Sequence, residues 1–280
     1  MSAYKSFALI GAGTLGGPIL SELASKGVSV VLLTRLGSKK DGLPAGVKVV
    51  SVDFNDVAEV TQALKANGVE VVLSTVATEA VSAQKPLVEA AKAAGIKLMV
   101  PSEYGMPTDG QTEGVLGAKN EIAEFIKSAG IPSLRIYIGG FAEFVPWLFA
   151  IEDKKIHIVG KGEAPVTITA IADIAGFVAH VLTTLPASEL ENKIFRIQGD
   201  RLKAQDIGPL FGASTVYVDT VPGELGELKT GLQRAFNSGA GSTGWNAATQ
   251  SEGTGDAAAG SANKYWPGHQ WKTVKDVHGL

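Results

Sequence analysis

The amino end of the chain carries a glycine-rich turn, Gly-Ala-Gly-Thr-Leu-Gly over residues 11–16, with the spacing of a phosphate-binding loop. The turn follows an apolar, strand-like run and precedes a segment with helical periodicity. One glycine permits a tight turn, the second lets a pyrophosphate approach the backbone, and the third lets the helix pack against the strand. Free N–H groups and the helix dipole would hold the phosphates. The residues expected to contact a dinucleotide here are Gly11, Gly13, Thr14, Leu15 and Gly16. A strand-to-helix turn without a ligand is the alternative.

The residue that follows the second strand-like run normally selects between the two nicotinamide cofactors. An acidic side chain at this position accepts a bond from the ribose 2′-hydroxyl, whereas an arginine pairs with a 2′-phosphate. Here the residue is Arg35, with Lys39 and Lys40 beyond it and no acidic residue before Asp41. The sequence therefore favours NADPH over NADH, and a solvated surface arginine is the alternative.

Polar and small residues follow the fourth and fifth strand-like runs. Thr75 and Val76 are expected beside the nicotinamide half of the cofactor, and Ser102 opens a polar cluster at the same sheet edge. Lys119 stands in the first turns of the next helical segment. Desolvation and a cationic nicotinamide would lower its pKa, so that it could serve as general acid. The alternative is a solvated lysine on an amphipathic helix.

These residues need a scaffold, and the chain predicts one by alternating two kinds of segment. Several strand-like runs are continuously apolar and β-branched, as in parallel strands buried on both faces. The predicted strands cover residues 6–10, 29–34, 47–52, 69–75, 97–100 and 133–138, and the helices 18–26, 56–66, 79–94 and 117–128. This order predicts an α/β fold with a doubly wound parallel sheet, the Rossmann fold.

The organisation changes in the second half of the chain. We expect residues 1–150 to form the NADP-binding Rossmann domain, and residues 151–280 to form a smaller, interleaved substrate-side lobe. Within that lobe, residues 237–263 consist mainly of Gly, Ala and Ser, a composition that predicts a flexible loop. The aromatic segment 265–271 then anchors the chain again.

Composition excludes several classes of protein. The net charge is −3, so the chain offers no basic face for nucleic acid. It has no cysteine, which excludes disulfides and thiolate chemistry, and its four histidines lack metal-ligand spacing. No apolar run is long enough for a membrane span, and no secretory signal precedes the first strand. We therefore expect a cytoplasmic protein without a metal ion.

Together these residues resemble the NmrA-like and isoflavone reductase-like group of atypical short-chain dehydrogenases. The glycine turn differs from the group's usual Gly-x-Thr-Gly-x-x-Gly, and Glu121 stands where the plant enzymes have a second lysine. The resemblance rests on the glycine turn, Arg35, Pro101-Ser102-Glu103-Tyr104-Gly105, Lys119, Gly130-Ile131-Pro132, Gly140-Phe141-Ala142-Glu143, residues 166–175, and residues 262–271, the last like fungal members.

The resemblance implies that Lys119 is the catalytic acid/base and that the cofactor is NADPH. It points to an NADPH-dependent reductase of a small aromatic or phenolic molecule, with a carbonyl or a benzylic ether as the group reduced. A second reading is a non-catalytic NADP(H)-sensing regulator, because the member that names the group is one. The sequence is compatible with a homodimer. The candidate substrate-binding residues are Tyr104, Gly140, Phe141, Phe144 and Trp245.

Overall fold

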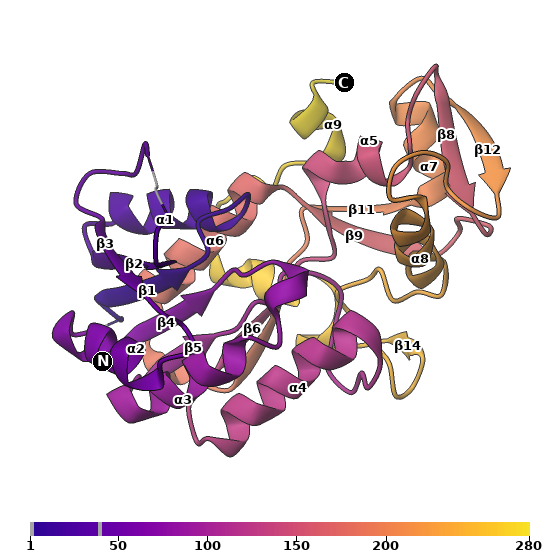
Figure 1. Ribbon diagram of the computed structural model, residues 1–280. Helices are drawn as coiled ribbons and strands as arrows, with labels where there is room; N and C mark the ends of the chain where they lie inside the picture. The colour runs from indigo at the N-terminus through magenta and orange to yellow at the C-terminus, as the bar shows by residue number, and fades with distance from the viewer. Residues whose placement is uncertain (1–2, 39–40) are drawn as a thin grey trace. The chain divides into compact units, whose positions relative to one another are not determined.

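The computed structural model describes residues 3–38 and 41–280, and the chain divides into two compact units (Figure 1). The segments of the two units alternate along the sequence. The first unit contains the chain up to Glu103, Gly110–Ile136 and Ile174–Phe195, and the second contains Tyr104–Asp109, Tyr137–Asp173 and Arg196–Leu280.

A five-stranded parallel sheet forms the centre of the first unit. Its strands lie in the order β3-β2-β1-β4-β5, which is the order of a Rossmann sheet. All five residues of β2 between its ends are buried, as are all of β4, because helices cover both faces. The predicted fold class is confirmed. The strands are β1 (Ser6–Ile10), β2 (Ser29–Arg35), β3 (Lys48–Val52), β4 (Val71–Ser74) and β5 (Leu98–Val100).

Helices pack on the two faces of this sheet, with α1 on one side and α2 and α3 on the other (Figure 1). Apolar side chains of α2, α3 and α4 share one buried core with the strands, including Leu64, Leu87 and Ile126. Asp56 caps α2 by accepting from the N–H groups of Ala58 and Glu59. The helices are α1 (Gly16–Ser25), α2 (Val57–Ala66), α3 (Gln84–Ala94), α4 (Gly114–Ser128) and α6 (Ile171–Thr184).

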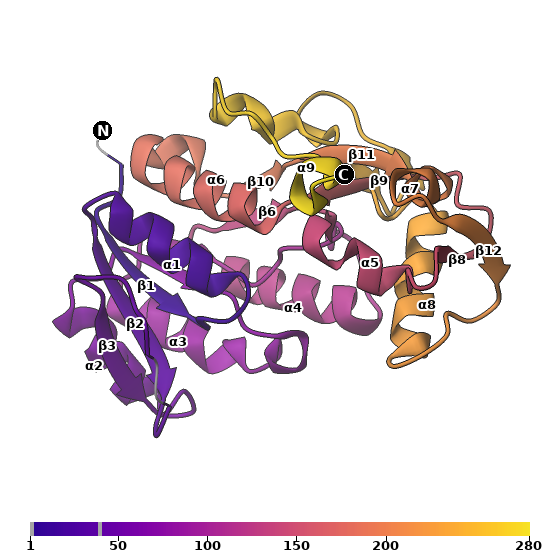
Figure 2. The same ribbon diagram turned by 90° about the horizontal axis from the view of Figure 1, so that it is seen from above.

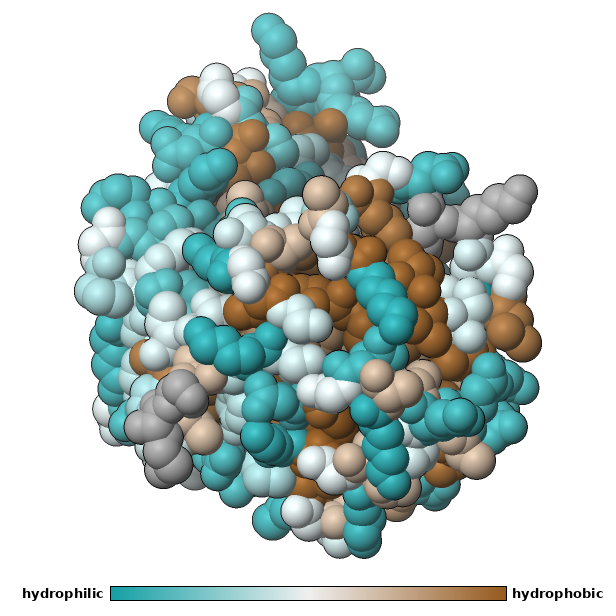
Figure 3. All heavy atoms as spheres, turned by 90° about the vertical axis from the view of Figure 1, so that its left-hand side faces the viewer, coloured by the Kyte–Doolittle hydropathy of each residue, from teal (hydrophilic) through white to brown (hydrophobic). Residues whose placement is uncertain are grey.

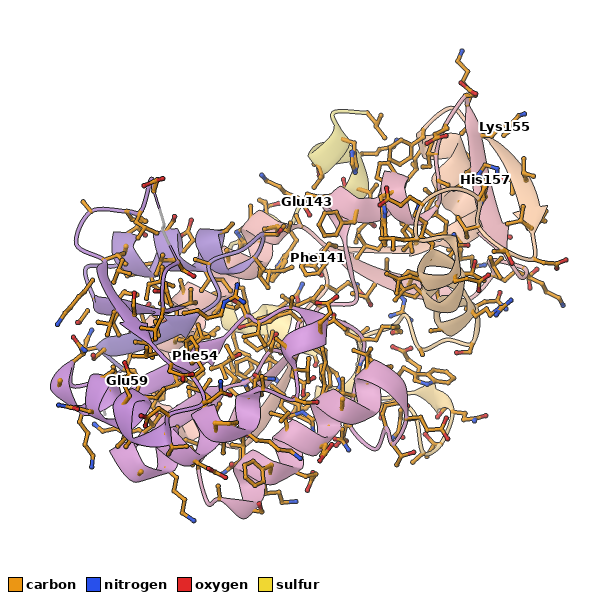
Figure 4. The ribbon with its side chains drawn as sticks, viewed as in Figure 1. Phe54, Glu59, Phe141, Glu143, Lys155 and His157 are labelled. Carbon is orange, nitrogen blue, oxygen red and sulfur yellow. The ribbon has the colours of Figure 1, made fainter. Side chains whose placement is uncertain are left out.

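Seen from the side of β3, the molecule shows apolar side chains gathered among hydrophilic ones (Figure 3). Val49 of this edge strand is exposed, whereas Val52 at its end is buried. Glu59, labelled in Figure 4, accepts from the backbone N–H of Asp53 at 3.2 Å and so joins the end of β3 to α2.

The sixth predicted strand forms, but it does not pair as a strand of the five-stranded sheet. This strand, β6 (Leu134–Tyr137), pairs with β10 (Lys193–Arg196) in a separate two-stranded sheet. It meets the five-stranded sheet through an isolated parallel bridge between Met99 and Ser133. Strand identity follows from local composition, whereas the partner depends on segments distant in sequence.

The second unit is built from short strands and helices (Figure 2). One sheet has the order β11-β9-β7, and β12 pairs with β8 in parallel. The strands are β7 (Gly140–Phe141), β8 (Lys155–Val159), β9 (Pro165–Thr169), β11 (Asp200–Lys203) and β12 (Ser214–Val218), and the helices are α5 (Val145–Leu148), α7 (Ala204–Leu210), α8 (Gly226–Asn237) and α9 (Val274–His278).

Residues 237–263 differ from the flexible loop that their composition predicts. They form the strand pair β13 (Trp245–Asn246) and β14 (Ser251–Glu252), and the carbonyl of Gly241 accepts from the N–H of Thr167 at 3.0 Å. A Cβ at Gly239 would lie 2.5 Å from the ring of Trp245. Small residues here let the backbone approach its neighbours closely, so the segment packs without large apolar side chains.

The division into units also differs from the predicted boundary at residue 150. Residues 174–195, which include most of α6 and part of β10, belong to the first unit. The rings of Phe177 and Phe195 pack edge to face within it, with centroids 6.0 Å apart. No helix of the described chain is long and apolar enough to cross a membrane.

Candidate functional site

The glycine turn lies between β1 and α1, and two of its glycines are required by the backbone. Gly11 has a φ of +90°, and a Cβ there would lie 2.8 Å from the carbonyl oxygen of Thr75. A Cβ at Gly16 would overlap the carbonyl oxygen of Gly11. Gly13 is different, because nothing lies within 4 Å of its Cβ position. The turn is therefore closed toward the sheet and open at Gly13, as the approach of a pyrophosphate requires.

The amino end of α1 faces this open side without a competing group. Leu15 is the N-cap residue and provides no side-chain hydrogen bond, and the first turn contains no acidic residue. Thr14 beside it is exposed. Such an end presents backbone N–H groups and the positive end of the helix dipole, so it favours an anion.

Thr75, which follows β4, fixes the turn from the neighbouring strand. Its N–H donates to the carbonyl of Ile10 at 2.8 Å, and its hydroxyl donates to the carbonyls of Ile10 and Gly11. The side chain that the sequence placed beside the nicotinamide therefore also has a structural task, which is to hold the start of the glycine turn.

Arg35 is the last residue of β2, and its side chain is exposed at the same sheet edge. Thr34 before it is buried and shares a hydrogen bond with Ser51 of β3 at 3.2 Å. The strand therefore ends with one side chain fixed inside and the guanidinium outside, where it is available to a 2′-phosphate. Lys39 and Lys40 lie outside the described residues.

Ser102 follows β5 and is held by two neighbours. Its hydroxyl donates to the carbonyl of Val76 at 2.8 Å, and its N–H donates to Oε1 of Gln84 at 3.2 Å. These bonds join the segments after β4 and β5, which are adjacent parallel strands. The two positions predicted from separate strand ends are thus brought together.

Lys119 lies in the second turn of α4, and its ammonium donates to the backbone carbonyl of Glu103. Burial lowers the pKa of this ammonium below its usual range, and the charge of Glu103 opposes that shift. The side chain therefore occupies a partly desolvated place at the carboxyl edge of the sheet. A lysine in this setting can exchange its proton closer to neutral pH than a solvated one.

Glu103 has a buried partner that was not predicted from the sequence. Arg135 on β6 donates from Nε to Glu103 Oε1 at 2.8 Å, and the two side chains are 8% and 1% exposed. Arg135 also donates from Nη2 to Oδ1 of Asn120, the residue after Lys119, at 3.1 Å. The available signal was an arginine inside the apolar run 133–138, because a buried charge requires a partner.

The predicted substrate-binding residues all belong to the second unit, and their placement around Lys119 stays a prediction. Tyr104 has a φ of +25°, and its buried hydroxyl has no hydrogen-bond partner among the described residues. Burial raises the pKa of this phenol well above its usual value. Trp245 lies in β13 and is not on a free loop.

Phe141 and Phe144 lie on either side of Glu143 in the sequence. Figure 4 labels Phe141 and Glu143. The two phenylalanine rings meet edge to face with centroids 5.6 Å apart, and Phe144 is 41% exposed. Glu143 accepts from the N–H of Ile171 at 2.9 Å, which fixes this segment against the start of α6. Gly140 pairs with Ile168 in the β11-β9-β7 sheet.

Residues 5–224 match the NmrA-like family, and this range exceeds half of the chain. The chain belongs to the NmrA-like family. The family resemblance drawn from the sequence is therefore confirmed.

Two fungal relatives of this NmrA-like protein are named as oxidoreductases. Oxidoreductase BOA1 of Botryotinia fuckeliana is 27% identical over 229 residues, which cover 73% of this chain and 74% of that protein. Oxidoreductase aprR of Aspergillus flavus is 35% identical over 127 residues, and this match spans 43% of the chain and less than half, 42%, of the relative.

Among solved structures, the complex of leucoanthocyanidin reductase with NADPH from Vitis vinifera has the same fold. Its TM-score is 0.80 at 20% identity, and the match covers 98% of each chain. At this identity the likeness shows that nearly the whole chain shares the fold.

Proposed function

We propose that this NmrA-like protein is an NADPH-dependent reductase of a small aromatic or phenolic molecule, with Lys119 as the general acid. The observation that carries the proposal is the partly buried ammonium of Lys119, which donates to the carbonyl of Glu103 at the carboxyl edge of the sheet and whose pKa is lowered by burial. Ligands of such sheets bind at this edge. The fungal relatives named as oxidoreductases support the reaction class, and the complex of leucoanthocyanidin reductase with NADPH supports NADPH as the cofactor.

The residues of the first unit fit NADPH. The open face at Gly13 and the uncapped start of α1 suit the pyrophosphate, and exposed Arg35 suits the 2′-phosphate. Thr75 and Val76 follow β4 and would border the nicotinamide, with Ser102 holding the carbonyl of Val76. When bound, NADPH supplies the hydride.

The protein's own residues would stabilise the charge that develops on the substrate and supply the proton. As hydride reaches the substrate, negative charge develops on its oxygen, and Lys119 Nζ would stabilise this charge and donate the proton. A lowered pKa makes the ammonium a stronger acid than a solvated lysine. Tyr104, Gly140, Phe141, Phe144 and Trp245 remain our candidates for substrate contacts.

The test is oxidation of NADPH with a panel of aromatic aldehydes, ketones and benzylic ethers. We expect turnover by the wild type and a fall of about 10²- to 10⁴-fold in Lys119→Met, the usual contribution of a general acid. Lys127→Met is the matched control, because Lys127 is an exposed lysine of the same helix. Tight NADPH binding without oxidation of any substrate would instead favour an NADP(H)-sensing regulator.

A further inference from the structure

Arg135 of β6 has a buried side chain, which contacts both the segment that carries Lys119 and the residue that accepts the hydrogen bond of Lys119. We propose that Arg135 is a positioning residue for Lys119, acting through Glu103 and Asn120. The inference rests on the proposed role of Lys119 as an acid, but its geometry and its test do not require turnover.

The first connection runs through Glu103. Arg135 Nε binds its carboxylate at 2.8 Å, while its backbone carbonyl accepts from Lys119. The N–H of Glu103 donates to the carbonyl of Pro101 at 2.8 Å, so the residue is fixed at both its backbone and its side chain. Arg135 thereby sets the direction in which the Glu103 carbonyl meets the ammonium of Lys119.

The second connection runs through Asn120. Arg135 Nη2 donates to its Oδ1 at 3.1 Å, and its Nδ2 donates to the carbonyl of Gln111 at 3.2 Å. Asn120 follows Lys119 directly, so this bond limits rotation of α4 about its axis. One guanidinium therefore joins the end of β5, the second turn of α4 and strand β6, and its rigid fork suits two acceptors better than a lysine would.

The same arrangement has an electrostatic consequence. The charge of Glu103 raises the pKa of Lys119 against the lowering caused by burial, and Arg135 offsets part of that carboxylate charge. Two acidic groups of the Lys119 helix lie at the surface. Glu121 of α4 pairs with Lys85 of α3 at 2.6 Å on the surface, and Glu113 at the start of α4 is exposed.

The test measures the pKa of Lys119 directly in four variants of the full chain. The lysine ε-carbon is labelled with ¹³C, the Lys119 signal is assigned by its loss in Lys119→Arg, and its chemical shift is followed against pH. We expect Arg135→Met to raise the pKa, because an uncompensated carboxylate remains, and Glu103→Gln to lower it, because an uncompensated guanidinium remains. The double variant, which leaves neither charge, should give a value between the two.

Lys85→Met is the control, since it removes an exposed ion pair between α3 and the Lys119 helix α4 and should leave the Lys119 titration unchanged. If one single variant does not fold, the other is compared with the double variant, whose Lys119 pKa should lie below that of Arg135→Met and above that of Glu103→Gln. Shifts of the same sign in both single variants, or shifts no larger than in Lys85→Met, would overturn the inference.

Kinetics separate the inference from the proposed function. Arg135→Met should lower kcat while leaving the Kd for NADPH within about twofold, because the glycine turn and Arg35 are not part of the cluster. Opposite pKa shifts without turnover on any substrate would retain Arg135 as a positioning residue and reject the reductase. Turnover by the wild type together with an unchanged Lys119 titration in the Arg135 and Glu103 variants would retain the reductase and reject the positioning role of Arg135.

Discussion

Two alanine substitutions in the glycine turn separate its structural part from its binding part. In Gly16→Ala the new methyl group would overlap the carbonyl oxygen of Gly11 and the hydroxyl of Thr75, both held by the hydrogen bonds of Thr75. In Gly13→Ala the methyl group would meet no atom within 4 Å. The two changes are chemically identical and lie three residues apart, so each is the control for the other.

The expected magnitudes follow from these surroundings. The neighbours of Gly16 are backbone and a side chain fixed to backbone, so they cannot move aside without disturbing the turn. We expect Gly16→Ala to lower the free energy of unfolding by about 1–3 kcal/mol, the usual cost of overpacking. Gly13→Ala should leave it unchanged or raise it by about 0.4–1 kcal/mol, because alanine restricts the unfolded chain.

Gly13→Ala should weaken NADPH binding although it leaves the stability of the fold intact. At Gly13 the methyl group would occupy the space into which the pyrophosphate approaches, so we expect affinity to fall at least about tenfold, equal to about 1.4 kcal/mol. Urea unfolding measures the free energy of unfolding, and calorimetric titration measures the affinity for NADPH. Gly13→Ala that binds NADPH like the wild type would refute the assignment of the turn to the pyrophosphate.

Three further predictions follow from the site and its supporting helices. Arg35→Glu should weaken NADPH by about tenfold to a hundredfold in calorimetry while NADH binding stays equal or improves; unchanged selectivity would remove the 2′-phosphate argument. The proposed acid must be protonated, so kcat should fall as pH rises through the pKa of Lys119, which burial places below the ordinary lysine value of about 10.4. A pH profile without this alkaline fall would contradict that role. Asp56→Ala should lower the free energy of unfolding by about 0.5–2 kcal/mol, since two N–H groups of α2 lose their acceptor; an unchanged urea midpoint would count against the cap.

Local composition predicted much of the first unit. Strands such as β2 and β4 are short, apolar and flanked by helical segments, so type and order follow from pattern alone. Helix starts were less accurate: α1 begins at Gly16 and α4 at Gly114, each ahead of the predicted start. The start of α3 differs in the other direction, because it lies at Gln84 and the predicted start was residue 79; apolar periodicity does not fix the first hydrogen-bonded turn of a helix.

Features that depend on distant segments could not be predicted. The pairing of Arg135 with Glu103 joins strands whose neighbourhood is known only once the sheet is formed. The composition of residues 237–263 predicts poor packing, yet Gly239 and Gly241 allow Trp245 and Phe236 to lie against the backbone. Glycine content alone does not distinguish a segment that packs closely against its neighbours from a mobile loop.

The central claim is that hydride leaves bound NADPH while Lys119 supplies the proton. The most direct measurement is a single-turnover reaction of the purified protein with a phenolic carbonyl or benzylic ether and NADPH deuterated at both C4 positions of the nicotinamide. Our account predicts deuterium in the product of the wild type, and a rate at least about 100-fold lower in Lys119→Met with NADPH affinity intact. Product without deuterium, or equal rates in the two proteins, would contradict it.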